Sequence, residues 1–121
     1  MKQFIAAALL LVAVATTAAS EPGPLEAEKI SCLISSIETL EGAIFIRNGS
    51  EHSPREAGEH LRMKLGNAGS RVRTAEDFIR LCASRSFLTR KPYLIKYDND
   101  TVIETATFLR EKLTRCPSPK E

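Results

Sequence analysis

The sequence predicts an α+β fold in which three or four helices pack on a small sheet of about three short strands, as a single domain. Apolar residues recur at the i, i+3, i+4 and i+7 spacing of helices in several separate segments. Short β-prone segments adjoin polar turns that contain Asn-Gly or Asp-Asn. The chain has 121 residues, and a mature domain of about 100 residues has room for one modest core.

Residues 1–20 have the layout of a secretory signal peptide. The basic Lys2 precedes an apolar run, and small residues lead to a cleavage position after Ser20 or Ala19. The apolar run is shorter than the roughly 20 residues that a spanning helix needs, so a membrane anchor is the weaker alternative. We therefore expect an exported, periplasmic protein that does not span the membrane.

The remaining residues, 21–121, should form one mature domain with a core from about residue 25 to 115. The chain has 17 Lys and Arg against 15 Asp and Glu, and cleavage removes Lys2, which leaves a net charge near +1. Nucleic-acid binders usually present a strongly basic face. The balanced charge and the predicted export therefore argue against nucleic acid as a partner, and we expect a monomer or a weak oligomer.

The first helix is expected from about Leu25 to Leu40, ending at Glu41-Gly42. Its apolar face is formed by Ile30, Leu33, Ile34, Ile37 and Leu40. The next segment, Ala43 to Ile46, is short, apolar and β-prone, so we expect a buried strand there. Asn48-Gly49 then forms a turn.

A second helix should begin directly after this turn, because every start signal is present. Ser53 can cap the helix, Pro54 fits its first position, and Glu56 completes a capping box. The helix is expected to run to about Leu65 and to stop at Gly66.

A third helix, a hairpin and a fourth helix complete the predicted fold. Thr74 should begin the third helix, whose buried side carries Ala75, Phe78, Ile79 and Cys82. We expect the hairpin strands at Tyr93 to Tyr97 and at Thr101 to Ile103. Thr105 should cap the last helix, which ends before Cys116.

The three cysteines predict one disulfide and one free thiol. Cys82 falls on the buried side of its helix and is expected to behave as a small core residue. Cys32 lies off the apolar face of the first helix, and Cys116 lies in a tail that can approach it. We therefore predict a Cys32–Cys116 disulfide, which an oxidising compartment would permit.

Three segments resemble a known family in their order and spacing: IFIRNGSEHSPREAGEHLRMKLG, RVRTAEDFI and KPYLIK. They are similar to the YfeK-like family of small exported proteobacterial proteins, a domain of unknown function, over about Ile30 to Lys96. Members often have Gly directly before K-P-Y, where this chain has Arg90. The resemblance implies a periplasmic protein with a signal peptide. It implies no reaction, and it carries over no catalytic residue.

One group of residues could support chemistry. His52, Glu56 and His60 are spaced four residues apart, which would align them on one side of a continuous helix. Two imidazoles and a carboxylate suit zinc, or general acid–base catalysis. However, His52 precedes the predicted cap, and Glu56 has a competing place in the capping box. We therefore expect no metal and no cofactor, and we keep this group as an alternative.

A second group could hold an anion. Arg47, Asn48 and Gly49 lie between a strand end and a helix start, where free N–H groups and an arginine can bind a carboxylate or phosphate. The ordinary interpretation is a turn and a local ion pair. If function is localised, we expect it on the surface formed by Arg47, Asn48, Gly49, His52, Glu56 and His60.

A basic segment follows this surface in the sequence. It contains Arg71, Arg73, Arg80, Arg85, Arg90 and Lys91. Such a segment is usually a solvated face, and it could also meet an anionic glycan, lipid headgroups or an acidic partner.

No recognisable catalytic motif is present, so a non-enzyme is favoured. The leading hypothesis is a periplasmic binding or interaction module for a protein or envelope component. The alternative is a small hydrolase or metal-dependent enzyme that uses His52, Glu56 and His60.

Overall fold

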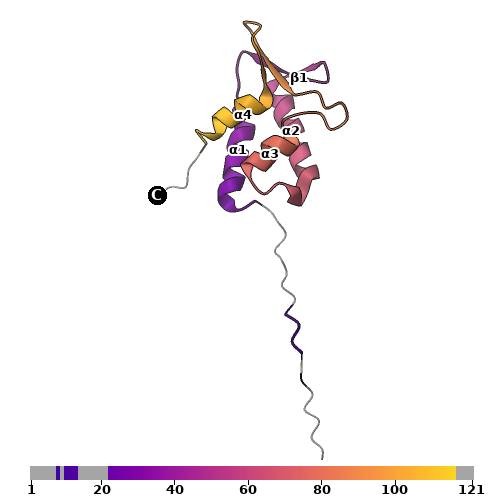
Figure 1. The fold of residues 1–121 in the computed structure, drawn as a ribbon. Coiled ribbons are helices and arrows are strands. Elements are labelled where there is room, and N and C mark those ends of the chain that lie inside the picture. The colour runs from indigo at the N-terminus through magenta and orange to yellow at the C-terminus, as the bar shows by residue number, and fades with distance from the viewer. Residues whose placement is uncertain (1–7, 9, 14–21, 117–121) are drawn as a thin grey trace, which may run out of the picture.

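A computed structural model of the chain describes residues 8, 10–13 and 22–116. The elements within them are α1 (Pro24–Glu38), β1 (Ala43–Arg47), β2 (Ser50–His52), α2 (Pro54–Ala68), the 3₁₀ turn η1 (Gly69–Arg71), α3 (Ala75–Cys82), β3 (Leu94–Tyr97), β4 (Val102–Glu104) and α4 (Thr105–Leu113). The strands lie at one end of the helices (Figure 1). This architecture confirms the predicted α+β fold.

The predicted signal peptide, residues 1–20, falls largely outside the described residues, and its predicted cleavage position falls wholly outside them. Both stay predictions. In the part of the chain that the structure describes, no helix combines the length and the apolar character needed to cross a bilayer.

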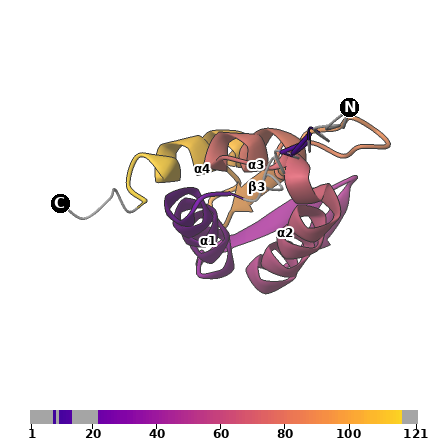
Figure 2. The same cartoon turned by 90° about the horizontal axis from the view of Figure 1, so that it is seen from below.

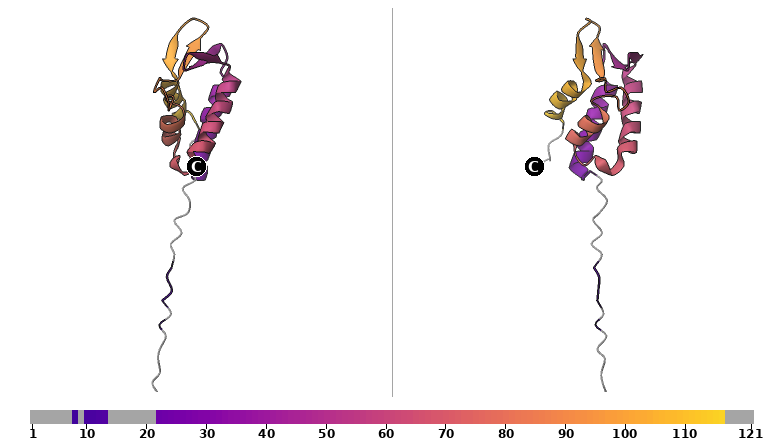
Figure 3. Two further views of the ribbon diagram at one scale, coloured as in Figure 1. Left: turned by 90° about the vertical axis from the view of Figure 1, so that its right-hand side faces the viewer. Right: turned by 45° about the vertical axis from the view of Figure 1, so that its right-hand side comes forward.

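The sheet has four antiparallel strands in the order β2-β1-β3-β4. It therefore consists of two hairpins that join along β1 and β3, where Phe45 lies opposite Ile95. Ala43, Phe45 and Ile95 are buried, while their neighbours along the strands are only partly buried. One face of the sheet thus packs on the helices, as alternating side chains require. The β3–β4 hairpin extends beyond the helices (Figure 3).

The strand β2 was not predicted, and the expectation of a helix directly after the turn is wrong. Asn48 and Gly49 have φ values of +51° and +78°, the pattern of a two-residue hairpin turn. The turn therefore pairs Ser50–His52 with β1. β2 is a short polar strand at the edge of the sheet, so its sequence, SEH, shows no apolar alternation. The usual sequence signal of a strand is therefore missing.

The helices enclose the core on the other side. α1 packs against α2, α3 and α4, and it buries Ile30, Leu33, Ile34 and Ile37, as predicted. It ends at Glu38, so Leu40 lies beyond the helix, contrary to the prediction, and is only partly buried. Gly58 lets α1 and α2 approach closely, since a Cβ at this position would collide with the side chain of Glu38. Phe78 and Leu109 complete the centre of the core with no exposed surface or nearly none.

Two further helix boundaries differ from the prediction. α2 continues past Gly66 to Ala68 and ends at Gly69, whose φ of +54° suits a residue without a side chain. An interior glycine costs only about 1 kcal/mol, which the packing of the helix outweighs. Thr105 is the first residue of α4 and forms no cap. Its N–H donates to the Tyr93 carbonyl at 2.8 Å, which turns the residue into the interior.

The other caps are confirmed. Ser53 Oγ accepts from the N–H of Glu56 at 3.1 Å, and the Glu56 carboxylate accepts from the N–H of Ser53 at 3.3 Å. Thr74 Oγ1 likewise accepts from the N–H of Asp77 at 3.0 Å. These bonds satisfy N–H groups that the first turn of a helix leaves without partners.

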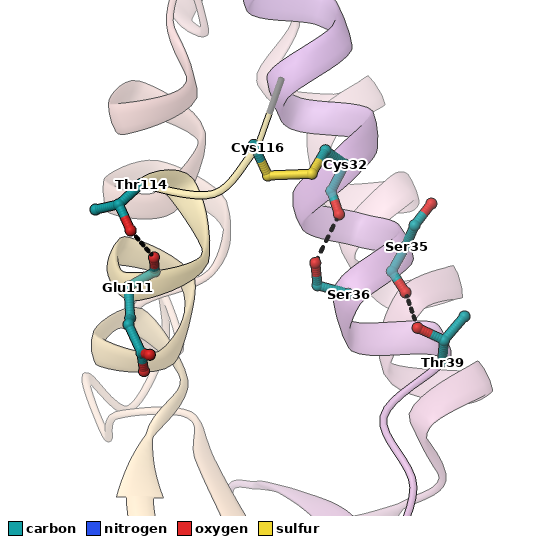
Figure 4. The surroundings of a disulfide bond; sticks show 7 residues. All are labelled: Cys32, Ser35, Ser36, Thr39, Glu111, Thr114 and Cys116. Carbon is teal, nitrogen blue, oxygen red and sulfur yellow. Dashed lines mark hydrogen bonds between the residues drawn. A yellow bond between two sulfur atoms is a disulfide. The ribbon is translucent and has the colours of Figure 1, made fainter. Parts of the chain in front are cut away.

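The predicted disulfide is present. Cys32 in α1 is bonded to Cys116 beyond α4, with 5.9 Å between the two Cα atoms (Figure 4). Cys82 is a free thiol with no exposed surface, as predicted, and burial raises its pKa. The bond therefore ties the first helix to the last one, at the side of the helical layer that α4 occupies.

Candidate functional site

The structure divides the predicted surface into two parts. The first part is a small cavity of about 30 Å³. Its lining includes Arg47 of β1, His52 of β2, His60 of α2, Tyr93 and Thr105. His52 Nε2, His60 Nε2 and Thr105 Oγ1 are buried and have no hydrogen-bond partner among the described residues. The cavity accommodates about one water molecule, so it has no room for a substrate of ordinary size.

His60 is a neutral imidazole at pH 7. Burial, followed by the charges of Arg47 and Lys64 and by His52, lowers the pKa of His60 to about 4. The ring lies edge-on to Tyr93, with 5.8 Å between the centroids. The Tyr93 hydroxyl in turn accepts from Lys64 Nζ at 2.8 Å. The imidazole is thus placed by packing and carries no charge with which to hold an anion.

His52, Glu56 and His60 do not form a metal site. His52 Nδ1 lies 3.6 Å from a carboxylate oxygen of Glu56. That carboxylate also belongs to the capping box, and its bonds with Ser53 contribute most to lowering the pKa of Glu56. Within residues 8, 10–13 and 22–116, no three His, Cys, Asp or Glu side chains are placed to hold a metal ion. The metal-dependent alternative therefore has no support from these side-chain positions.

The second part of the predicted surface is the Asn48-Gly49 turn. It contacts the loop between α3 and β3, residues 83–93. Asn48 Oδ1 accepts from Thr89 Oγ1 at 2.5 Å, and Asn48 Nδ2 donates to Ser86 Oγ at 3.3 Å. The side chain of the Asn48-Gly49 turn is therefore directed at this loop. The sequence could not show this contact, because its partners lie about 40 residues further along the chain.

The α3–β3 loop has a fixed backbone. The N–H of Ser86 donates to the Lys91 carbonyl at 3.0 Å, and the N–H of Arg90 donates to the Ser86 carbonyl at 3.0 Å. Ser86 is only 5% exposed. At the tip, Phe87 and Leu88 are 86% and 88% exposed, respectively. The loop therefore presents two large apolar side chains to solvent on an ordered scaffold.

Arg90 has a φ of +61°, in the left-handed region. An L-residue pays roughly 1–2 kcal/mol for this conformation, and glycine does not. The arginine therefore adds a charge at the base of the loop at some cost in stability.

Basic residues line two hollows beside Phe87. One hollow of about 230 Å³ is lined by Lys64, Arg80, Arg85 and Arg90 together with Phe87. A second hollow of about 440 Å³ also has Phe87 and Lys64 in its lining, and adds Arg71. Neither lining contains a carboxylate. The tip is therefore set among positive charges that have no acidic neighbour in the same hollow.

Three of the cations at the loop have no ionic partner among the described residues. They are Arg85, Arg90 and Lys91. The neighbouring Arg80 differs, because it pairs with Asp77 at 3.3 Å. The residues of the sequence-predicted basic segment are exposed. Sequence reasoning missed Phe87 and Leu88, although an apolar pair inside a basic loop was the signal that could have found them.

Comparison with known proteins gives a family and no activity. A family model described as "Family of unknown function (DUF5329)" matches residues 24–117. The "Uncharacterized protein YfeK" of Salmonella typhimurium (strain LT2) is 43% identical over 68 residues, which are 56% of this chain and 57% of that protein. The matched part thus spans less than two thirds of the relative. No solved structure matches the chain.

Proposed function

The chain belongs to the DUF5329 family of unknown function, and we propose that it acts by binding and not by catalysis. It is an exported module, with a mature domain at residues 21–121, that holds a component of the cell envelope through the α3–β3 loop. The YfeK-like resemblance expected from the sequence is confirmed by the family and by the relative.

The observation that supports this proposal is the exposure of Phe87 and Leu88 on a fixed loop. A flexible loop could fold its apolar side chains back onto the protein. This loop is fixed by the backbone bonds of Ser86 and by the side chain of Asn48, so its tip stays in solvent. An exposed apolar patch with a polar rim is typical of an interaction site. Its fixed backbone also reduces the entropy that binding costs.

The alternative, a small hydrolase using His52, Glu56 and His60, fits the structure less well. The two imidazoles face a cavity of about 30 Å³, and Glu56 lies in the capping box. A candidate active site usually combines a larger concave pocket with convergent polar groups. We therefore retain the binding module.

The export part of the proposal depends on residues 1–20. It is tested by fractionating expressing cells and by measuring the intact mass of the protein. We expect an amino terminus at Glu21 or Ser20 in the periplasmic fraction. Recovery of the chain with Met1 in a membrane fraction would show that it is not exported in this way.

The binding part is tested by site-specific cross-linking in cells. A photo-reactive residue in place of Leu88 should form adducts with an envelope component. The same residue in place of Met63, which is 55% exposed on α2, serves as the matched control. Adducts at position 88 that are absent at position 63 support the proposal. No adduct at position 88, or equal adducts at both positions, would overturn it.

A further inference from the structure

We infer that the envelope component is the anionic surface of a lipid bilayer. Phe87 and Leu88 insert into it, and the surrounding basic residues contact its phosphate headgroups. This inference rests on the function proposed above, and it goes further by naming the chemical class of the partner.

The first argument is the shape of the tip. The α3–β3 loop projects from one side of the molecule, and the carboxyl-terminal end of α4 lies on the opposite side (Figure 2). Its tip is an exposed apolar pair, with Phe87 and Leu88 adjacent in the sequence. A protein partner would need a pocket shaped to receive this tip. A bilayer needs none, because apolar side chains can enter the boundary between headgroups and acyl chains.

The second argument is charge complementarity. The hollows that Phe87 helps to line contain Lys64, Arg71, Arg80 and Arg85 and no carboxylate. Each basic residue near an anionic membrane surface strengthens binding by roughly fivefold. These cations line the hollows beside Phe87, where they could meet the headgroups around an inserted tip.

The third argument is that the two features occur together. A small apolar insertion alone, or a few basic residues alone, gives only weak membrane binding, and stable attachment takes two signals. The described chain places both signals on one loop. A third hollow of about 310 Å³ has Arg85 and Arg90 in its lining, with Glu104 as its single carboxylate. Arg80 and Arg110 also line it, but they pair with Asp77 at 3.3 Å and with Glu76 at 3.0 Å.

The test uses the purified protein, in the form in which cells accumulate it, and vesicles of known composition. We expect it to sediment with vesicles of phosphatidylethanolamine and phosphatidylglycerol, and not with vesicles of phosphatidylcholine alone. High salt should weaken the binding, because the screening length falls from about 10 Å at 0.1 M to about 3 Å at 1 M. Equal binding to both kinds of vesicle would contradict the role of the cations.

Paired variants distinguish the contribution of the loop to vesicle binding from that of other exposed apolar residues. Phe87→Ser with Leu88→Ser should weaken binding to anionic vesicles by roughly tenfold or more. Met63→Ser with Val102→Ser, at positions 55% and 47% exposed, should leave it unchanged. Arg85→Gln with Lys91→Gln should also weaken binding. Equal effects of the loop variants and their controls would overturn the inference.

The matched control for the charges lies at the disulfide side. Lys29→Gln with Arg115→Gln changes the net charge by the same amount and should leave vesicle binding unchanged. Both residues are close in sequence to the disulfide cysteines, Cys32 and Cys116. An equal loss of vesicle binding in this pair of variants and in the loop pair would show that binding depends only on the net charge of the protein.

Insertion itself can be observed, because the chain contains no tryptophan. Phe87→Trp then provides a single reporter, whose fluorescence should shift to the blue on anionic vesicles. Met63→Trp should show no shift. Binding without a shift at position 87, or complete competition by soluble glycerol phosphate, would mean that headgroups bind without insertion, and would overturn the inference as stated.

The two proposals fail in different ways. Cross-links from Leu88 to a protein in cells, with no vesicle binding, would overturn the lipid partner and leave the binding module standing. Absence of both results would overturn both.

Discussion

The disulfide side of the molecule and the α3–β3 loop side differ in whether their charged and apolar side chains have partners. At the disulfide side, Cys32 is bonded to Cys116, and the nearby cations have local partners. Lys29 pairs with an acid one helical turn away at 3.5 Å, and Arg115 pairs with another at 3.1 Å. Exposed pairs of this kind contribute little stability, so the covalent bond stabilises this side more than its ion pairs do.

The α3–β3 loop side has the opposite character. Phe87 and Leu88 are exposed, Arg90 occupies a strained conformation, and Arg85 and Lys91 have no ionic partner in the part of the chain that the structure describes. None of these features stabilises the fold. The comparison teaches that this small domain has its covalent cross-link on one side and exposes apolar and unpaired charged groups, for which we propose a binding role, on the other. The predictions below test that division, beginning with the largest expected effect.

Removing the disulfide should cause the largest loss of stability. Cys32→Ala with Cys116→Ala opens a covalent loop between residues 84 apart in sequence, which should lower the free energy of unfolding by about 4–5 kcal/mol in the chain-entropy model. Urea unfolding monitored by circular dichroism measures it. Vesicle binding by the folded variant should be unchanged. A loss below about 1 kcal/mol would show that this side is not the main point of stabilisation.

Acid should destabilise the protein through His60 of α2. Its pKa is about 4 in the fold, compared with an ordinary value of 6.5. Between these values the unfolded chain binds a proton that the folded chain does not, so stability falls as the pH is lowered from 6.5 to about 4. The neighbouring Arg47, Lys64 and His52 oppose the same protonation.

The variant His60→Leu should reduce this pH dependence, as measured by urea unfolding at several pH values across the window. Glu56 and Asp77, whose pKa values are lowered in the fold, affect stability only below their ordinary values of 4.5 and 3.8. An unchanged slope above pH 4.5 in the variant would mean that His60 is not the responsible group.

Replacing Arg90 should change stability and binding in opposite directions. Arg90→Gly removes a residue with φ of +61°, and after allowance for the flexibility of glycine it should raise the free energy of unfolding by about 0.5–1 kcal/mol. Loss of the charge should weaken binding to anionic vesicles by roughly fivefold. A variant that gained stability and kept full binding would exclude Arg90 from the recognition surface.

Replacing the tip should have the smallest effect on stability. Phe87→Ser with Leu88→Ser should change the free energy of unfolding by less than about 0.5 kcal/mol, because both side chains are almost fully exposed. Thermal melting beside the unmodified protein measures this. A clear destabilisation would show that the tip packs on the body of the molecule, and the contrast between the two sides would no longer hold.

The sequence was sufficient for features with a local physical cause. The apolar residues of α1 recur at helical spacing, and the residues that are buried follow that spacing. Ser53 and Glu56 are three residues apart, so their capping box forms within one turn. The disulfide also followed from local reasoning, since the helical position of Cys82 left Cys32 and Cys116 as the pair.

Features that depend on distant partners could not be predicted. The strand β2 is polar and exists through its pairing with β1. Thr105 points inward because its N–H is bonded to the Tyr93 carbonyl. Asn48 was expected at a binding surface, and its side chain instead meets Ser86 and Thr89. Such contacts are set by the tertiary arrangement, which no local pattern encodes.

The burial of Cys82 has a consequence for the chemical lifetime of the disulfide. Exchange between a thiol and a disulfide requires a thiolate that can reach a sulfur atom. Cys82 is fully buried and its pKa is raised, so in the folded protein it is both protonated and out of reach. Scrambling of the Cys32–Cys116 bond by this thiol therefore has to wait for an opening of α3, and the rate of that opening limits how fast the bond can rearrange within one molecule.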